Sequence, residues 1–298
     1  MQPTRRALLL GLALSPVLAI AAPPKAERWE RWTRNNPAAP RVLNHTLWTQ
    51  FLGRYVVTGA DGVARVRYGA VSGEDRGYLR VYLDQLQRTE VSKLRPDEQL
   101  AYWINLYNAH TVKLVLERYP LASILSIAIS PGLFAKGPWG ANMLKVEDET
   151  LSLDDIEHRI LRPLWHDPRT AYALCRAAIG SPNLASEAYT ASNAGAMFDA
   201  AARAFVNTPR GVRFDEKGRL QVSSLYEWLK PDFGAKDADV IAHLRQYAAP
   251  ALAEQLASVT RIGGDAFDWK LNDQIDDSQG GGELAPTLYG PAAPAAGE

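Results

Sequence analysis

PDEQLAYWINLYNA, residues 96–109, predicts a helix that is buried on nearly every side. Pro96 suits the first helical position, and the acidic pair Asp97 and Glu98 complements the positive end of the helix dipole. The helix should continue to about Arg118 and end before Pro120, because proline cannot extend it. Its side chains are apolar nearly all round, which is typical of a helix in the centre of a core.

Working outward from this helix, apolar residues recur at helical spacing on both sides of it, within residues 42–52, 79–86, 197–205 and 240–247. Residues 143–153 and 212–222 predict hairpins that turn at 147–149 and 216–218. The apolar run 172–179 fits either a central strand or a helix. Helices that alternate with short hairpins indicate an α+β, helix-dominated single domain with short antiparallel hairpins, spanning residues 41–272.

The N-terminus has the pattern of an export signal. Arg5 and Arg6 precede an apolar run, and residues 19–21 read Ala-Ile-Ala, so residues 1–21 predict a cleavable signal peptide. TRRALLL, residues 4–10, favours the twin-arginine route, with ordinary secretion as the alternative. The apolar run is shorter than the ~20 residues of a membrane helix. We therefore expect a periplasmic or secreted protein with no stable membrane insertion after signal cleavage.

Both flanks of the domain are expected to lack a core of their own. Prolines bracket residues 22–40, which we interpret as a linker with at most one short helix around Trp29 and Trp32. Residues 273–298 are polar and then rich in glycine, proline and alanine. Such a tail has too little apolar surface to offset the entropy of ordering, so we expect it to be disordered.

Charge and motifs exclude several classes of protein. Lysine plus arginine and aspartate plus glutamate number 33 each, so no basic surplus points to nucleic acid as a partner. The histidines show no metal-ligand spacing, and no glycine-rich phosphate loop or Gly-x-Ser-x-Gly turn is present. We therefore expect neither a metal nor another cofactor. Cys175 is the only cysteine, which rules out an intrachain disulfide.

The polar residues inside apolar segments are the candidates for a site. Asn105 and Asn108 lie three apart on one face of the central helix, where they either tie backbone to the core or orient a ligand. Trp103 and Tyr107, four apart on the same helix, are either core side chains or part of a ligand cage. Glu157 and His158 offer acid–base chemistry or a structural ion-pair cluster.

Five motifs together resemble the family called domain of unknown function 547. They run in the family's order across residues 41–272: AYWINLYNA at 101–109, GPW at 137–139, LSLDDIEH at 151–158 with Arg162, IGSPNL at 179–184 and FDWKLN at 267–272. The resemblance implies an uncharacterised domain, often exported in bacteria, with no established activity. Together with the polar residues weighed above, the motifs give Trp103, Asn105, Asn108, Trp139 and Arg162 as the binding candidates.

The chain departs from the family pattern at one place. Members often show a histidine, a cysteine five residues later and a second cysteine before the proline of the fourth motif. This chain has Ala171, Arg176 and Ser181 at those positions, and Cys175 is one place off. If relatives use such a pair as a thiol catalyst, this chain lacks it.

Three functions stay open on the sequence alone. The first is an exported domain of unknown role that binds a small molecule or an envelope component. The second is a periplasmic hydrolase or transferase that uses Glu157 and His158, supported by Asn105, Asn108 and Arg162. The third is an interaction module with an aromatic surface. An enclosed pocket holding His158 and both asparagines would favour the enzyme, and asparagines satisfied by backbone groups would favour the others.

Overall fold

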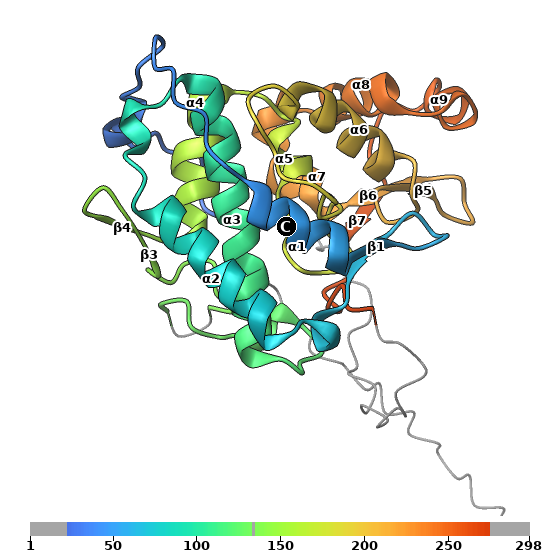
Figure 1. The fold of residues 1–298 in the computed structure, drawn as a ribbon. Coiled ribbons are helices and arrows are strands. Elements are labelled where there is room, and N and C mark those ends of the chain that lie inside the picture. The colour runs from blue at the N-terminus through green and yellow to red at the C-terminus, as the bar shows by residue number, and fades with distance from the viewer. Residues whose placement is uncertain (1–22, 133–134, 275–298) are drawn as a thin grey trace, which may run out of the picture.

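The computed structural model describes residues 23–132 and 135–274, and the predicted signal peptide and nearly all of the predicted tail lie outside these residues. The central helix α3, Pro96–Arg118, has the predicted bounds (Figure 1). Pro96 stands in its first turn with Asp97 and Glu98, and Tyr119 already has extended backbone. Most of α3 is buried, as expected for a helix that is apolar on every side.

The larger hydrophobic core forms around α3. Helix α2, Gly73–Gln87, packs on α3, and helix α1, Thr46–Tyr55, and strand β3, Leu144–Val146, pack in turn on α2. Strand β3 forms a hairpin with β4, Glu149–Leu151. A π-helix, η5, Asp155–Leu161, runs into α4, Arg162–Trp165, on the same core. Smaller elements complete this part: η1 Glu30–Thr33, β1 Val56–Thr58, β2 Ala64–Val66, η2 Tyr68–Ala70, η3 Val91–Lys93 and η4 Ile124–Ser126.

A second core lies beside the first, among the elements coloured yellow to orange in Figure 1. A three-stranded sheet joins β5, Val212–Phe214, antiparallel to β6, Leu220–Ser223, and β6 parallel to β7, Gly264–Ala266. Of the helices in this part, α7, Ser224–Trp228, contacts β6 and β7. The others pack mainly on one another: α5 Thr170–Ala173, α6 Ala194–Val206, η6 Lys230–Phe233, α8 Asp237–Tyr247 and α9 Pro250–Leu256.

The fold class predicted from the sequence is confirmed, because helices dominate and the strands form short, mostly antiparallel pairs. Both predicted hairpins are present. The ambiguous run 172–179 combines its two interpretations: it begins in α5 and then becomes extended, with Ala178 bridging Leu271. None of the helices within the described ranges is long and apolar enough to cross a bilayer.

Residues 23–29, the first part of the predicted linker, lie along the π-helix. The N–H groups of Glu27 and Trp29 each donate over 3.0 Å, to the carbonyls of His158 and Arg159 respectively. Pro163 has no N–H. It lies five residues after His158, where a π-turn would need a donor, and four residues after Arg159, where an α-turn would need one. The N-terminal segment therefore supplies the donors that the helix lacks.

Candidate functional site

The two asparagines of α3 are occupied by backbone groups. Asn105 donates to the carbonyl of Tyr189 over 2.7 Å and accepts from the N–H of the same residue over 3.1 Å. Asn108 donates to the carbonyl of Ala173 over 2.8 Å and accepts from the N–H of Cys175 over 2.9 Å. Each amide thus holds a distant loop on α3, and a ligand would have to displace those bonds.

Trp103 lies inside the core. It is 1% exposed, and its ring meets Trp32 edge-on at 5.0 Å between centroids. No second face of the ring is open to a ligand in this arrangement. Trp103 is therefore occupied by core packing, and the two asparagines by backbone groups.

The π-helix η5 carries Glu157 and His158 into the core. Ser152 and Asp155 start it with a reciprocal capping box: the N–H of Ser152 donates to Asp155 over 2.9 Å, and the N–H of Asp155 donates to the Ser152 hydroxyl over 3.0 Å. A π-turn is rare and is often found at functional sites. Because the π-turn is wider, Glu157 and His158, which are neighbours in sequence, both lie in the core and are each 2% exposed.

Glu157 is held as an anion by Arg176. The two side chains form a buried ion pair between η5 and the extended segment that follows α5. Burial alone would raise the pKa of Glu157, but the charges of Arg176 and Arg162 and the hydrogen bond from Arg176 outweigh it and lower the pKa. A carboxylate fixed in this way is a poor proton acceptor, because protonating it would break the ion pair.

His158 is neutral and its tautomer is set by a neighbour. Arg162 can only donate, so the 2.8 Å contact of its Nη1 makes Nδ1 of His158 an acceptor and leaves the proton on Nε2. That Nε2 lies 3.7 Å from Oδ1 of Asp154. Burial lowers the pKa of His158 to about 4. Arg162 itself donates two hydrogen bonds to the Asp232 carboxylate, over 2.5 and 2.9 Å.

Asp154 is the carboxyl group poised near neutrality. Its side chain is 29% exposed, more than those of Glu157 and His158. Burial and the negative charge of Glu157 raise the pKa of Asp154 to about 7, against the opposing charge of Arg176. A group with this pKa can both give and take a proton at neutral pH.

Three polar atoms around these charges have no hydrogen-bond partner within residues 23–132 and 135–274. They are the hydroxyl of Tyr107, Nε1 of Trp139 and Nη1 of Arg176. Burial raises the pKa of Tyr107, and the charges of Arg176, Glu157 and Asp154 also act on this group. The N–H of Trp139 faces the Tyr107 hydroxyl as a weak donor that lowers this pKa, but the contact does not reach hydrogen-bonding geometry. These groups therefore lie around the same hydroxyl. Buried polar groups are nearly always paired, so such a concentration of unpaired atoms requires an explanation.

We call Tyr107, Trp139, Asp154, Glu157 and Arg176 the buried polar cluster. Its outer side continues into aromatic side chains that are each partly exposed. Trp139 meets Trp269 edge-on at 5.5 Å, and Trp269 lies 4.4 Å from Phe267 and 5.7 Å from Trp228 between ring centroids. These partly exposed rings provide flat apolar faces next to the cluster.

The sequence analysis did not select Tyr107, Asp154 or Arg176 for the site, although each carried a signal. Tyr107 lies on the central helix, and Asp154 precedes His158 by one helical turn. Arg176 stands at the position where the resemblance described above leads one to expect a cysteine. Cys175, its neighbour, is buried with a raised pKa, and burial is the main cause. The thiol is therefore held in its protonated, unreactive form.

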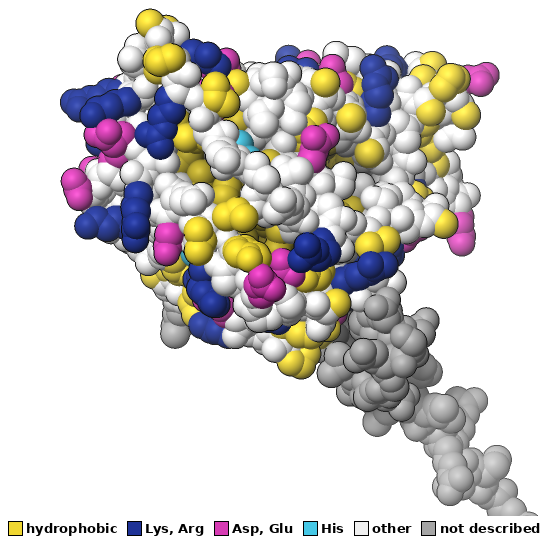
Figure 2. Space-filling model, viewed as in Figure 1, with side chains coloured by type: hydrophobic (Ala, Val, Ile, Leu, Met, Phe, Trp, Pro, Cys, Tyr) yellow, Lys and Arg dark blue, Asp and Glu magenta, His cyan; other side chains and the backbone are white. Residues whose placement is uncertain are grey.

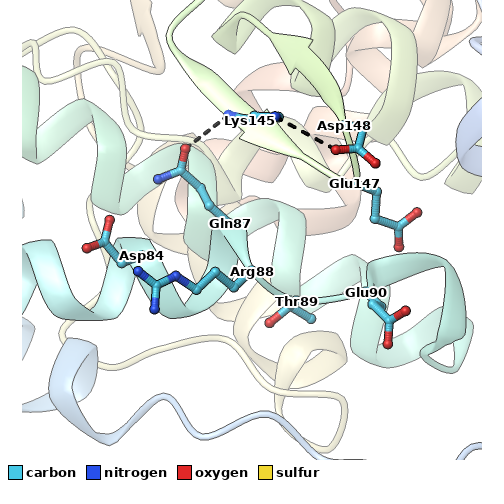
Figure 3. A pocket seen from close by; sticks show the side chains of 8 residues that line it. All are labelled: Asp84, Gln87, Arg88, Thr89, Glu90, Lys145, Glu147 and Asp148. Atoms are coloured by element: carbon cyan, nitrogen blue, oxygen red, sulfur yellow. Dashed lines mark hydrogen bonds and ion pairs between the residues drawn. The ribbon is translucent and has the colours of Figure 1, made fainter.

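A depression of about 370 Å³ lies elsewhere, between the end of α2 and the β3–β4 hairpin (Figure 3). None of the residues predicted for the site lines it. Glu147 at its edge already accepts bonds of 2.6 Å from both Arg31 and the N–H of Ser92. Lys145 and Asp148 extend into solvent. This depression therefore contains solvated charges rather than unpaired polar atoms.

Within the described residues, neither the distribution of charge on the face shown in Figure 2 nor the placement of metal-binding side chains points to a second site. On the face shown in Figure 2, lysine and arginine side chains are interspersed with aspartate and glutamate, as a net charge of zero predicts. Among the residues that the structure places, no three histidine, cysteine or acidic side chains are grouped to hold a metal ion.

Comparison with known proteins supports the domain family identified from the motifs. Residues 91–206 match the model of the family described as protein of unknown function, DUF547. The matched segment contains every member of the buried polar cluster. No curated protein and no solved structure matches the chain.

Proposed function

We propose that this chain, similar over residues 91–206 to DUF547 proteins, binds a small polar molecule at the buried polar cluster. The observation that carries the proposal is the group of three unpaired polar atoms, on Tyr107, Trp139 and Arg176, within one cluster. Leaving a buried polar group unpaired costs about 1–3 kcal/mol each, so a ligand that pairs all three recovers a substantial free energy. The half-buried Trp139 and the partly exposed Asp154 lie on the open side of the cluster.

The setting of this function is part of the proposal. The Arg5-Arg6 leader favours an exported protein that meets its ligand in the periplasm or outside the cell, where the ligand is a small molecule or an envelope component. The π-turn supports a functional role for this segment, because such turns are common at binding and catalytic sites.

A thermal-shift screen of small polar compounds tests the proposal. We expect at least one compound to raise the melting temperature of the wild type more than that of a Tyr107→Phe variant, which loses only the unpaired hydroxyl. The matched control is Tyr82→Phe, because that buried hydroxyl is bonded to Nδ1 of His45 over 2.7 Å. If every hit acts equally on both variants, the ligand does not bind at the cluster.

Asp154 favours a second function, a hydrolase or transferase. In this alternative Asp154 acts as the general acid or base, with His158 orienting it and Glu157 holding Arg176. Its pKa of about 7 is the supporting observation. An Asp154→Asn variant that binds the screened ligand but no longer turns it over supports this alternative, whereas unchanged turnover rejects it.

A further inference from the structure

The unpaired atoms of the buried polar cluster share one property, which is that they donate hydrogen bonds. Nε1 of Trp139 and Nη1 of Arg176 can only donate, and the hydroxyl of Tyr107 can donate as well as accept. A ligand atom that pairs with them must therefore be an acceptor. Oxygen is suited to this role, because a carbonyl oxygen has two lone pairs and accepts more than one bond.

The charges of the neighbouring groups decide between a neutral and an anionic acceptor. Arg176 is already neutralised by Glu157, and Arg162 by its two bonds to Asp232. Asp154 adds a second carboxyl group beside Glu157, and the charge of Glu157 acts on it. An anionic ligand would therefore lie beside the buried Glu157 carboxylate, while both of these arginines are already paired with carboxylates.

We infer that the ligand presents a neutral carbonyl oxygen, such as that of an amide, to Tyr107, Trp139 and Arg176. This inference rests on the proposed function and names the chemical class of its ligand. A neutral oxygen satisfies the donors and leaves the Glu157–Arg176 pair undisturbed. A protonated Asp154 adds a further donor at the open side of the same group.

The aromatic side chains predict what accompanies the amide. Trp139 belongs to the cluster and also packs edge-on against Trp269, whose ring adjoins Phe267 and Trp228. A ring attached to the carbonyl would therefore reach flat aromatic faces while its oxygen faces the donors. Benzamide and benzoate form the matched pair of probes, because they share one shape and differ in charge.

The experiment follows the indole N–H of Trp139 by NMR in the full chain, which has eight tryptophans, with the signal assigned from a Trp139→Phe variant. We expect benzamide to shift this signal in a saturable manner and benzoate to bind at least about tenfold more weakly. Tyr107→Phe should weaken benzamide about fivefold, as expected for one lost hydrogen bond of about 1 kcal/mol. Tyr102→Phe, whose hydroxyl is bonded to the carbonyl of Leu86, should leave the affinity unchanged.

The outcomes separate this inference from the proposed function. Tighter binding of benzoate at the Trp139 signal overturns the neutral class but keeps a ligand at the cluster. A Trp139 signal that neither probe moves also overturns the inference, and the compound screen with Tyr107→Phe then decides the proposed function by itself. Equal loss in the Tyr107→Phe and Tyr102→Phe variants overturns the assignment of Tyr107 as a donor to the ligand.

Discussion

Replacing Tyr107 by phenylalanine should leave the ligand-free protein as stable as the wild type or make it more stable. The side chain is fully buried, and its hydroxyl has no partner within the described parts of the chain. An unpaired buried hydroxyl costs about 1–3 kcal/mol, so its removal should raise the free energy of unfolding by about 1 kcal/mol after small losses in packing.

The matched change is Tyr102→Phe on the same helix. Tyr102 is equally buried, but its hydroxyl donates to the carbonyl of Leu86 over 3.0 Å. Losing this bond should lower the free energy of unfolding by about 1 kcal/mol. The two variants, which differ from the wild type by one oxygen each, should therefore differ from each other by about 2 kcal/mol.

Denaturant unfolding of the ligand-free protein measures this difference, and linear extrapolation gives each free energy. Both variants should keep the same dependence on denaturant, because neither changes the surface exposed on unfolding. A loss for Tyr107→Phe as large as the loss for Tyr102→Phe would refute the reasoning, since it would show that the Tyr107 hydroxyl is already bonded in the folded protein.

Three further predictions concern the groups around Tyr107. Relative to an Asp154→Asn variant, the wild type should lose stability as pH rises from about 4 to about 7, because folded Asp154, with its pKa raised to about 7, keeps a proton that the unfolded chain releases. The shift converts to at most about 4 kcal/mol, and partial exposure reduces it to about 2, measured by unfolding both proteins across that pH range. Glu157→Gln should cost about 3 kcal/mol in the same assay, because it leaves Arg176 charged and buried, and a cost below about 1 would contradict the ion pair. Asn108→Ala should lower the free energy of unfolding by about 2 kcal/mol through its two backbone bonds while the affinity for any ligand of the cluster stays the same, and a lost affinity in the folded variant would return Asn108 to the site.

The buried polar cluster shows why site prediction from the sequence was partial. Glu157 and His158 could be selected because they are adjacent on a short helix. Their protonation states could not, because His158 is neutral through burial and Glu157 is ionised through Arg176. Asp154 obtains its raised pKa from burial, which no pattern of spacing reports.

The sequence by itself determined the elements whose cause is local. Pro96 with its acidic neighbours begins α3 and Pro120 ends it, the capping pair Ser152 and Asp155 starts η5, and turn residues place the hairpins. Only the tertiary structure decided which side chains share one environment. Arg176 meets Glu157, and Tyr107 meets Trp139, because packing brings separate segments together. Ionisation and hydrogen bonding respond to distance and burial in space, and these quantities exist only after the chain has folded.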